Sequence, residues 1–160
     1  MKRAACLVAA IVLVGPAWVG EAQVVESVRM TAPPLLTFDV SDVDVITYAN
    51  GGTFTVAFDQ AVLRQGRGVR ISVRAEADLT PPAGAPITVA SLSWTTSGTM
   101  NGVGINGTLS KSQYRTVFES TPGAASGRVD ITWSLDLGNR NVRAGTHTGQ
   151  LRWRVETFIP

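Results

Sequence analysis

The segment "GQLRWRVETF", Gly149 to Phe158, decides the fold because apolar and charged residues alternate along it. Successive side chains of a β-strand point to opposite faces of its sheet. A strand here carries an apolar row and a charged row, namely Leu151, Trp153 and Val155 against Arg152, Arg154 and Glu156. We predict the closing strand of a sandwich with Trp153 in the core, so that the tryptophan and the arginines do not form one contact surface.

The same alternation recurs upstream of this segment, separated each time by turn residues. In "VRISVRA", Val69 to Ala75, and in "VDITWSL", Val129 to Leu135, every second residue is apolar. Helical periodicity is absent downstream of residue 22, so we predict an all-β fold, an immunoglobulin-like antiparallel β-sandwich. About nine strands are expected from such runs, near residues 35–40, 43–48, 53–58, 68–76, 86–95, 103–109, 113–119, 127–136 and 146–158.

Turn residues separate the predicted strands. "NGG", Asn50 to Gly52, lies between two strand-like runs and predicts a tight hairpin. "TPPAGAP", Thr80 to Pro86, interrupts the chain after a strand, and further turns are expected at Thr121 to Gly127 and at Leu137 to Asn141. The glycine-rich stretch from Ser97 to Gly107 predicts a weak hairpin or an exposed loop.

The first residues have the layout of a secretory signal peptide. Two basic residues precede an uncharged run from Ala4 to Val19, and small residues then lead to a cleavage site before Gln23. That run is shorter than the roughly 20 apolar residues of a membrane-spanning helix. We therefore expect residues 1–22 to be removed. Cys6 leaves with them, so no disulfide can form in the processed chain.

The remaining chain is expected to form one domain, residues 35–160, preceded by residues 23–34. The segment 23–34 ends in Pro33-Pro34, and it is either an ordinary first strand or an arm, within residues 23–30, donated to a neighbouring subunit. The full chain has 14 basic and 12 acidic residues. Processing leaves it close to neutral, which argues against a nucleic-acid partner.

The titratable residues offer two candidate catalytic or metal-binding sites. His147 is the one histidine and lies in an alternating run without a Gly-x-Ser-x-Gly motif, so an ordinary strand residue is expected. Asp39, Asp42 and Asp44 could supply oxygen ligands for calcium or a pair of catalytic carboxylates, although their alternation with valines favours a solvated strand face. We assign no catalytic residue, no cofactor-binding residue and no metal ligand, and we expect no enzyme.

The arginines and tryptophans offer two further candidate sites. Arg64, Arg67, Arg70 and Arg74 could bind an acidic polysaccharide or a membrane surface, but Glu76 follows on the same predicted face and favours a solvated surface. The tryptophans of the processed chain could form a sugar-stacking platform, although apolar companions favour core burial for each. They are Trp94, Trp133 and Trp153.

A glycosylation acceptor pattern occurs at Asn106-Gly107-Thr108. Its use depends on the machinery of the host.

The segment "AGTHTGQLRWRVE", Ala144 to Glu156, resembles the closing segment of secreted bacterial β-sandwich families of the spore coat U and fimbrial-subunit type. The resemblance implies an immunoglobulin-like sandwich with a structural or adhesive surface role. His147 stands where an aromatic residue is usual in those families. Many fimbrial subunits also carry a disulfide, which the processed chain cannot form, so no functional residue is carried over.

These observations predict an exported, non-enzymatic module with a structural, adhesive or assembly role at the bacterial cell surface. The alternative is a carbohydrate-binding module that uses a tryptophan or the stretch from Ser97 to Gly107. The expected partners are the protein itself or other envelope proteins through strand addition, or a surface glycan, with membrane contact during export only. The expected location is extracellular, on the cell surface or in the periplasm.

Overall fold

The computed structural model describes residues 9–10, 26–81, 83–138 and 142–160. These residues form antiparallel strands and one 3-10 turn at Val89–Ser91, which confirms the all-β prediction. The strands are β1 (Ala9–Ala10), β2 (Ser27–Thr31), β3 (Leu35–Val40), β4 (Thr47–Val62), β5 (Gly68–Ala75), β6 (Leu92–Met100), β7 (Gly102–Gly104), β8 (Gly107–Thr108), β9 (Arg115–Ser120), β10 (Gly127–Leu135) and β11 (Gly145–Phe158).

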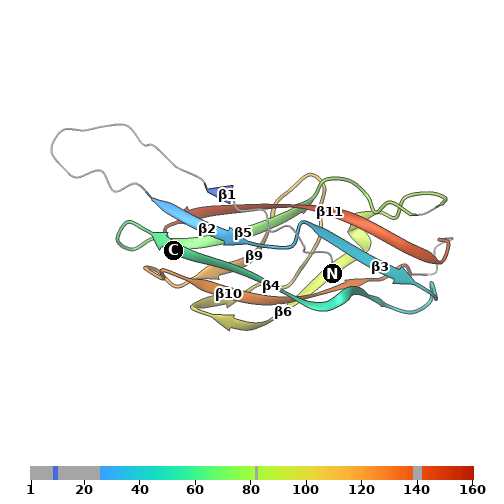
Figure 1. Ribbon diagram of the computed structural model, residues 1–160, viewed down its shortest axis with the longest axis horizontal. Coiled ribbons are helices and arrows are strands. Elements are labelled where there is room, and N and C mark those ends of the chain that lie inside the picture. The colour runs from blue at the N-terminus through green and yellow to red at the C-terminus, as the bar shows by residue number, and fades with distance from the viewer. Residues whose placement is uncertain (1–8, 11–25, 82, 139–141) are drawn as a thin grey trace, which may run out of the picture.

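The strands form two sheets. The first has the order β1-β2-β4-β10-β6-β8 and the second the order β3-β11-β5-β9-β7. In Figure 1, β11 runs along the upper side of the molecule, and β10 and β6 run along its lower side. The rings of Phe58 on β4 and Phe118 on β9 meet with centroids 6.2 Å apart, so side chains of the two sheets share one core.

In the central strands, the alternation of apolar and polar residues in the sequence correctly predicts which side chains lie in the core. The apolar residues at every second position of β5, from Val69 to Ala75, are buried, and so are those of β10, from Val129 to Leu135. On β11, Leu151 and Val155 are buried while Arg152 is exposed. Period-two patterning therefore reports which face of each strand is turned to the core.

The hairpin predicted at Asn50–Gly52 is wrong. β4 runs through these residues and includes the strand expected near 53–58, whereas of the strand expected near 43–48 only residues 47–48 belong to β4 and residues 43–46 lie in the turn before it. The pairing of β4 with β10 slips at the predicted hairpin, because Thr132 lies opposite Thr53 whereas Ser134 lies opposite Tyr48. Gly51 and Gly52 have φ angles of 98° and 71°, which favour glycine. The glycines therefore form a bulge that lets β4 continue in the same direction.

The glycine-rich stretch from Ser97 to Gly107 is more ordered than a loop. β6 extends to Met100, and β7 then joins the second sheet before β8 returns to the first. A Cβ atom on Gly104 would lie 2.6 Å from Thr96, and one on Gly107 would lie 2.6 Å from Trp94. Glycine is needed here because the backbone crosses between the sheets in contact with their side chains.

The other predicted turns lie where they were expected. Residues 121–126 connect β9 to β10, and Thr80 to Pro86 follows β5. Part of the turn at Leu137 to Asn141 and most of the predicted signal peptide, residues 1–22, lie outside the described residues. Among the residues that are described, no helix has the length and hydropathy to cross a membrane.

The segment 23–34 contributes a strand to its own sheet. β2 pairs with β4, with Met30 opposite Phe58 and Thr31 opposite Ala57. On its other side β2 pairs with β1, a strand of two residues in which Ala9 lies opposite Met30. Among the residues that the structure describes, no other strand pairs with this outer edge of β2.

Candidate functional site

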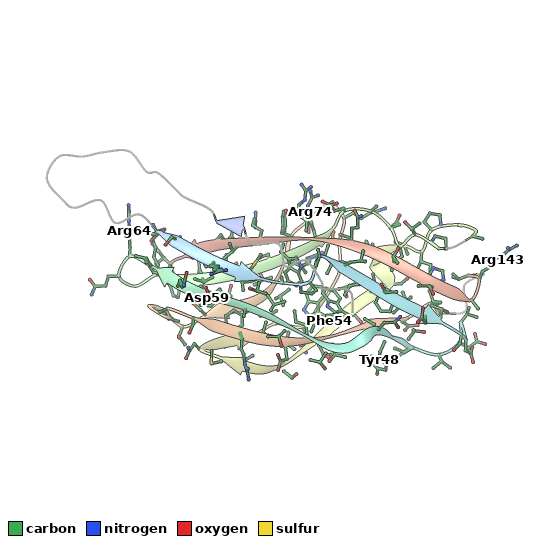
Figure 2. All side chains as sticks on the ribbon, in the orientation of Figure 1. Tyr48, Phe54, Asp59, Arg64, Arg74 and Arg143 are labelled. Carbon is green, nitrogen blue, oxygen red and sulfur yellow. The ribbon has the colours of Figure 1, made fainter. Side chains whose placement is uncertain are left out.

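The outer side of the second sheet carries a dense group of arginines, carboxylates and aromatic rings. Arg74 on β5 lies opposite Arg152 on β11, and Ser72 lies opposite Arg154. We call this surface the arginine face, and its members are Arg70, Arg74, Arg152, Arg154, Glu76, Glu119, Glu156, Tyr114 and Phe158. Figure 2 shows Arg74 projecting from the upper side of the molecule, away from Tyr48 on the lower side.

Most guanidinium groups of the arginine face have carboxylate partners. Arg70 Nε donates to Glu119 Oε1 at 2.7 Å, and its Nη1 lies 3.7 Å from Glu156 Oε1. Arg154 Nη2 approaches Glu156 Oε2 at 3.3 Å. One Glu156 carboxylate is thus shared by two arginines. Exposed pairs of this kind contribute about 0–1 kcal/mol each to stability.

Arg152 and Arg74 differ in their partners. Arg152 Nη2 lies 2.6 Å from Glu76 Oε1. Arg74 has no carboxylate partner within the described part of the chain; its Nη1 donates to the Lys111 carbonyl at 3.1 Å, and its buried Nε has no hydrogen-bond partner. Arg74 is therefore the guanidinium on this surface whose charge is not neutralised.

Two aromatic rings hold the arginines in place. Arg70 lies over Phe158, 4.5 Å from the ring centroid. Tyr114 is shared, because Arg154 lies 4.5 Å and Arg74 lies 5.3 Å from its centroid. Contact of a cation with the face of an aromatic ring is favourable, so each ring helps to hold its arginines at this surface.

The four arginines singled out in the sequence do not gather at one place. Arg70 and Arg74 lie on the arginine face, whereas Arg67 pairs with Glu26 at 3.3 Å at another place in the fold. The Arg152 and Arg154 side chains, which the sequence assigned to an outer row, join Arg70 and Arg74. Sequence reasoning missed Tyr114, since nothing in its neighbourhood distinguishes it from an ordinary strand residue.

Glu26 is a buried carboxylate at the start of β2. It is 7% exposed and accepts hydrogen bonds from the Arg64 amide at 3.1 Å, from Arg67 Nη1 at 3.3 Å and from Thr157 Oγ1 at 2.9 Å. These contacts join β2 to the segment after β4 and to the end of β11. We call Glu26, Arg67 and Thr157 the clasp.

The tryptophans occupy the core rather than a sugar platform. Trp94 is 1% exposed and Trp133 is fully buried, as predicted. Trp94 Nε1 donates to the Ile105 carbonyl at 2.7 Å. Trp153 is half-buried against the core, and its Nε1 donates to the Pro33 carbonyl at 2.7 Å. The indole rings therefore pack against side chains of the core.

His147 lies on β11, as predicted, and is completely buried. Its Nε2 lies 3.0 Å from the Arg143 carbonyl, and its Nδ1 has no hydrogen-bond partner among the described residues. A single imidazole held by a backbone carbonyl inside the core has no access to a substrate.

Of the three aspartates, Asp39 lies on β3, whereas Asp42 and Asp44 lie in the turn between β3 and β4 and not on the strand face that the sequence predicted. Asp39 accepts hydrogen bonds from Thr146 Oγ1 and Asn50 Nδ2, both at 2.7 Å, and these bonds lower the pKa of its carboxyl. Asp42 accepts from the Asp44 amide at 2.9 Å. In the described ranges, no three His, Cys, Asp or Glu side chains are grouped to hold a metal ion.

A shallow pocket of about 410 Å³ lies beside the edge of Trp94. Its polar lining comes from Asn106, Thr108, Arg115 and Thr116. Asn106 is exposed, and its Oδ1 accepts hydrogen bonds from the amide and the hydroxyl of Thr96. A second pocket of about 400 Å³ is lined by Ser91, Ser93, Asp136 and neighbouring residues.

Comparison with family models, with curated proteins and with solved structures gives no match for this chain.

Proposed function

We propose that this protein is an exported, non-enzymatic module with an immunoglobulin-like sandwich arrangement and a structural, adhesive or assembly role at the bacterial cell surface. In this proposal residues 1–22 are a signal peptide, and the module is of the general kind that the spore coat U and fimbrial-subunit families represent. It joins copies of itself or other envelope proteins by strand addition. The observation that carries the proposal is the outer edge of β2, to which β1 is already added as an antiparallel strand.

Export would free this edge. Ala9 and Ala10, which pair with Met30 and Arg29, belong to the proposed signal peptide. Their removal leaves backbone donors and acceptors of β2 without partners. An unpaired edge is a template on which a strand of another chain can form main-chain hydrogen bonds.

The clasp makes β2 an acceptor rather than a donor. If residues 23–30 were donated to a neighbour, the Glu26 carboxylate would leave Arg67 and Thr157. Withdrawal of Glu26 would leave Arg67 and Thr157 without their shared acceptor, a loss that opposes donation of the strand. The strand therefore stays in its own sheet, and its free edge receives a partner.

The oligomeric state of two forms of the protein tests this proposal. Light scattering after size exclusion should show concentration-dependent oligomers for the chain that begins at Gln23 and a monomer for the chain that retains residues 1–22. Hydrogen exchange should slow in β2 on assembly and remain unchanged in β7, a border strand of the other sheet. A Gln23 form that stays monomeric at high concentration and binds neither cells nor envelope material would exclude the role.

A second candidate function, carbohydrate binding, is favoured by the pocket beside Trp94. Its exposed asparagine, threonine and arginine could bond sugar hydroxyls, whereas the buried indoles could not stack on a ring. A glycan array should then give hits that Arg115→Ala removes and Arg128→Ala leaves intact, since Arg128 is an exposed arginine of β10 in the other sheet. An array without hits counts against this function.

A further inference from the structure

Arg74 and Arg152 stand directly opposite each other on β5 and β11. Like charges at directly opposed positions of an antiparallel pair destabilise it. We propose that the structure keeps this unfavourable pair because Arg74, together with Arg154, which contacts the same Tyr114 ring, binds a carboxylate group of a ligand. The ligand class is a small carboxylate or the uronate units of an acidic polysaccharide.

The charges on the arginine face show where the ligand's carboxylate fits. Along the surface, contacts run from Glu119 to Arg70, from Arg70 to Glu156 and from Glu156 to Arg154, so acidic and basic groups alternate. Arg154 and Arg74 then contact the same tyrosine ring, and no carboxylate of the described residues pairs with both arginines. An anion placed between these two guanidinium groups would continue the alternation.

The site is built before a ligand arrives. Tyr114 holds Arg74 and Arg154, and the Lys111 carbonyl fixes Nη1 of Arg74. Glu76 occupies Arg152, which leaves Arg74 as the arginine of this face without a carboxylate partner among the described residues. Planar guanidinium groups bind carboxylates through paired hydrogen bonds, and such charge-assisted bonds are about twice as strong as neutral ones.

The position of β5 argues for a saccharide or small carboxylate rather than a peptide strand. β5 lies between β11 and β9, so both of its edges are paired. A peptide cannot add to this part of the sheet through main-chain hydrogen bonds. At this part of the sheet a ligand can contact only side chains. The face is open, so an extended polymer of uronates could lie along it.

Calorimetry and thermal unfolding of the Gln23 form test the site with defined probes. The probes are galacturonate, oligogalacturonate, neutral oligogalactose and a glutamate-rich peptide, each at constant ionic strength set with sodium chloride. Galacturonate or its oligomer should raise the Tm. A larger rise with galacturonate would identify a small free acid as the ligand, and a larger rise with the oligomer would identify a polysaccharide. Neutral oligogalactose should leave the Tm unchanged.

Three variants separate binding from folding. Arg74→Met keeps the apolar stem over Tyr114 and should weaken galacturonate binding about tenfold or more, the effect of losing a hydrogen bond to a charged group. Its Tm without ligand should equal or exceed that of the wild type, because the opposed Arg152 loses its like-charged neighbour. Arg128→Met should bind as the wild type does, and Tyr114→Leu should bind more weakly.

Several results would overturn the carboxylate site. They are equal binding by Arg74→Met and wild type, equal binding of neutral and acidic saccharides, tighter binding of the glutamate-rich peptide than of galacturonate, and no binding of any probe. The site lies on a different sheet from the outer edge of β2, so these results are independent of the oligomerisation test.

Discussion

Trp94 and Trp133 lie directly opposite each other on β6 and β10, with ring centroids 5.2 Å apart and ring planes inclined by 54°. The two indoles are equally buried but differ in their polar atoms. Trp94 Nε1 donates to Ile105, whereas Trp133 Nε1 has no partner among the described residues. This difference makes the pair a direct test of what one buried hydrogen bond contributes.

We predict that Trp94→Phe destabilises the protein more than Trp133→Phe does. Both substitutions remove similar volume from the same cluster, but the first also leaves the Ile105 carbonyl without its donor. The expected difference in the free energy of unfolding is about 1 kcal/mol, measured by urea denaturation. Equal losses in the two variants would mean that the hydrogen bond contributes nothing net.

Loss of the buried carboxylate at the clasp should loosen both strands that it joins. Glu26→Ala is expected to lower the free energy of unfolding by about 2–3 kcal/mol, because Arg67 and Thr157 lose their shared acceptor in a largely buried site. Hydrogen exchange should accelerate at β2 and at the end of β11. Asp59→Ala, at an exposed position of β4, should have little effect, and a similar loss in both variants would argue against the clasp.

The carboxyl of Asp78 predicts a pH dependence of stability. The hydrogen bond from Lys111 Nζ is the main cause that lowers its pKa below the usual 3.8; burial, the next largest effect, opposes it, and the Val89 amide and the Lys111 charge add smaller lowering effects. A lowered pKa in the folded state stabilises the fold above 3.8. This contribution is lost as the pH falls through the lowered value.

Urea denaturation over a series of pH values checks this prediction. Wild type should be more stable than Asp78→Asn near neutral pH, and the difference should shrink toward zero as the pH falls below 3.8. Lys111→Met should reduce the same difference. A gap between wild type and Asp78→Asn that stays constant into acid would refute the assignment.

Two glycines that differ in their surroundings form a matched pair. Gly107→Ala would place a methyl group 2.6 Å from the Trp94 ring, which is held by its hydrogen bond and cannot yield. Gly149→Ala would meet Leu79 at 3.4 Å, an ordinary contact. We expect Gly107→Ala to cost about 1–3 kcal/mol by overpacking, and Gly149→Ala to be tolerated. Thermal unfolding distinguishes the two, and equal Tm values would contradict the expected close approach at Gly107.

Side-chain alternation was sufficient to predict the class of fold and the core, because period-two patterning is a local property. Val69, Ile71 and Val73 are buried as the pattern requires. The bulge at Gly51 and Gly52 was mistaken for a hairpin because the same positive φ angles serve both structures. Only the pairing of the flanking residues with β10 distinguishes them, and that pairing is not local.

The carboxylate site depends on register, which explains why the sequence alone did not reveal it. Arg74 and Arg152 are far apart in the chain, and a shift of one residue in the pairing of β5 with β11 would separate them. Glu76 suggested a solvated face because it follows Arg74 closely in sequence. In the structure its carboxylate is taken by Arg152, so Arg74 keeps an unbalanced charge.

The clasp also determines how the molecule would respond to tension. Glu26 opens β2 and Thr157 lies near the end of β11, and the two side chains meet at 2.9 Å, so the start of β2 and the C-terminus lie together at the left of Figure 1. A force that draws these two segments apart loads the Glu26 contacts first. It would then peel β2 from β4 one main-chain bond at a time, since β2 is paired on that side only along a short stretch. We expect the domain to unfold at low force when it is pulled through the start of β2 and the C-terminus. It should unfold at higher force when the pull is applied to the central strands of the two sheets.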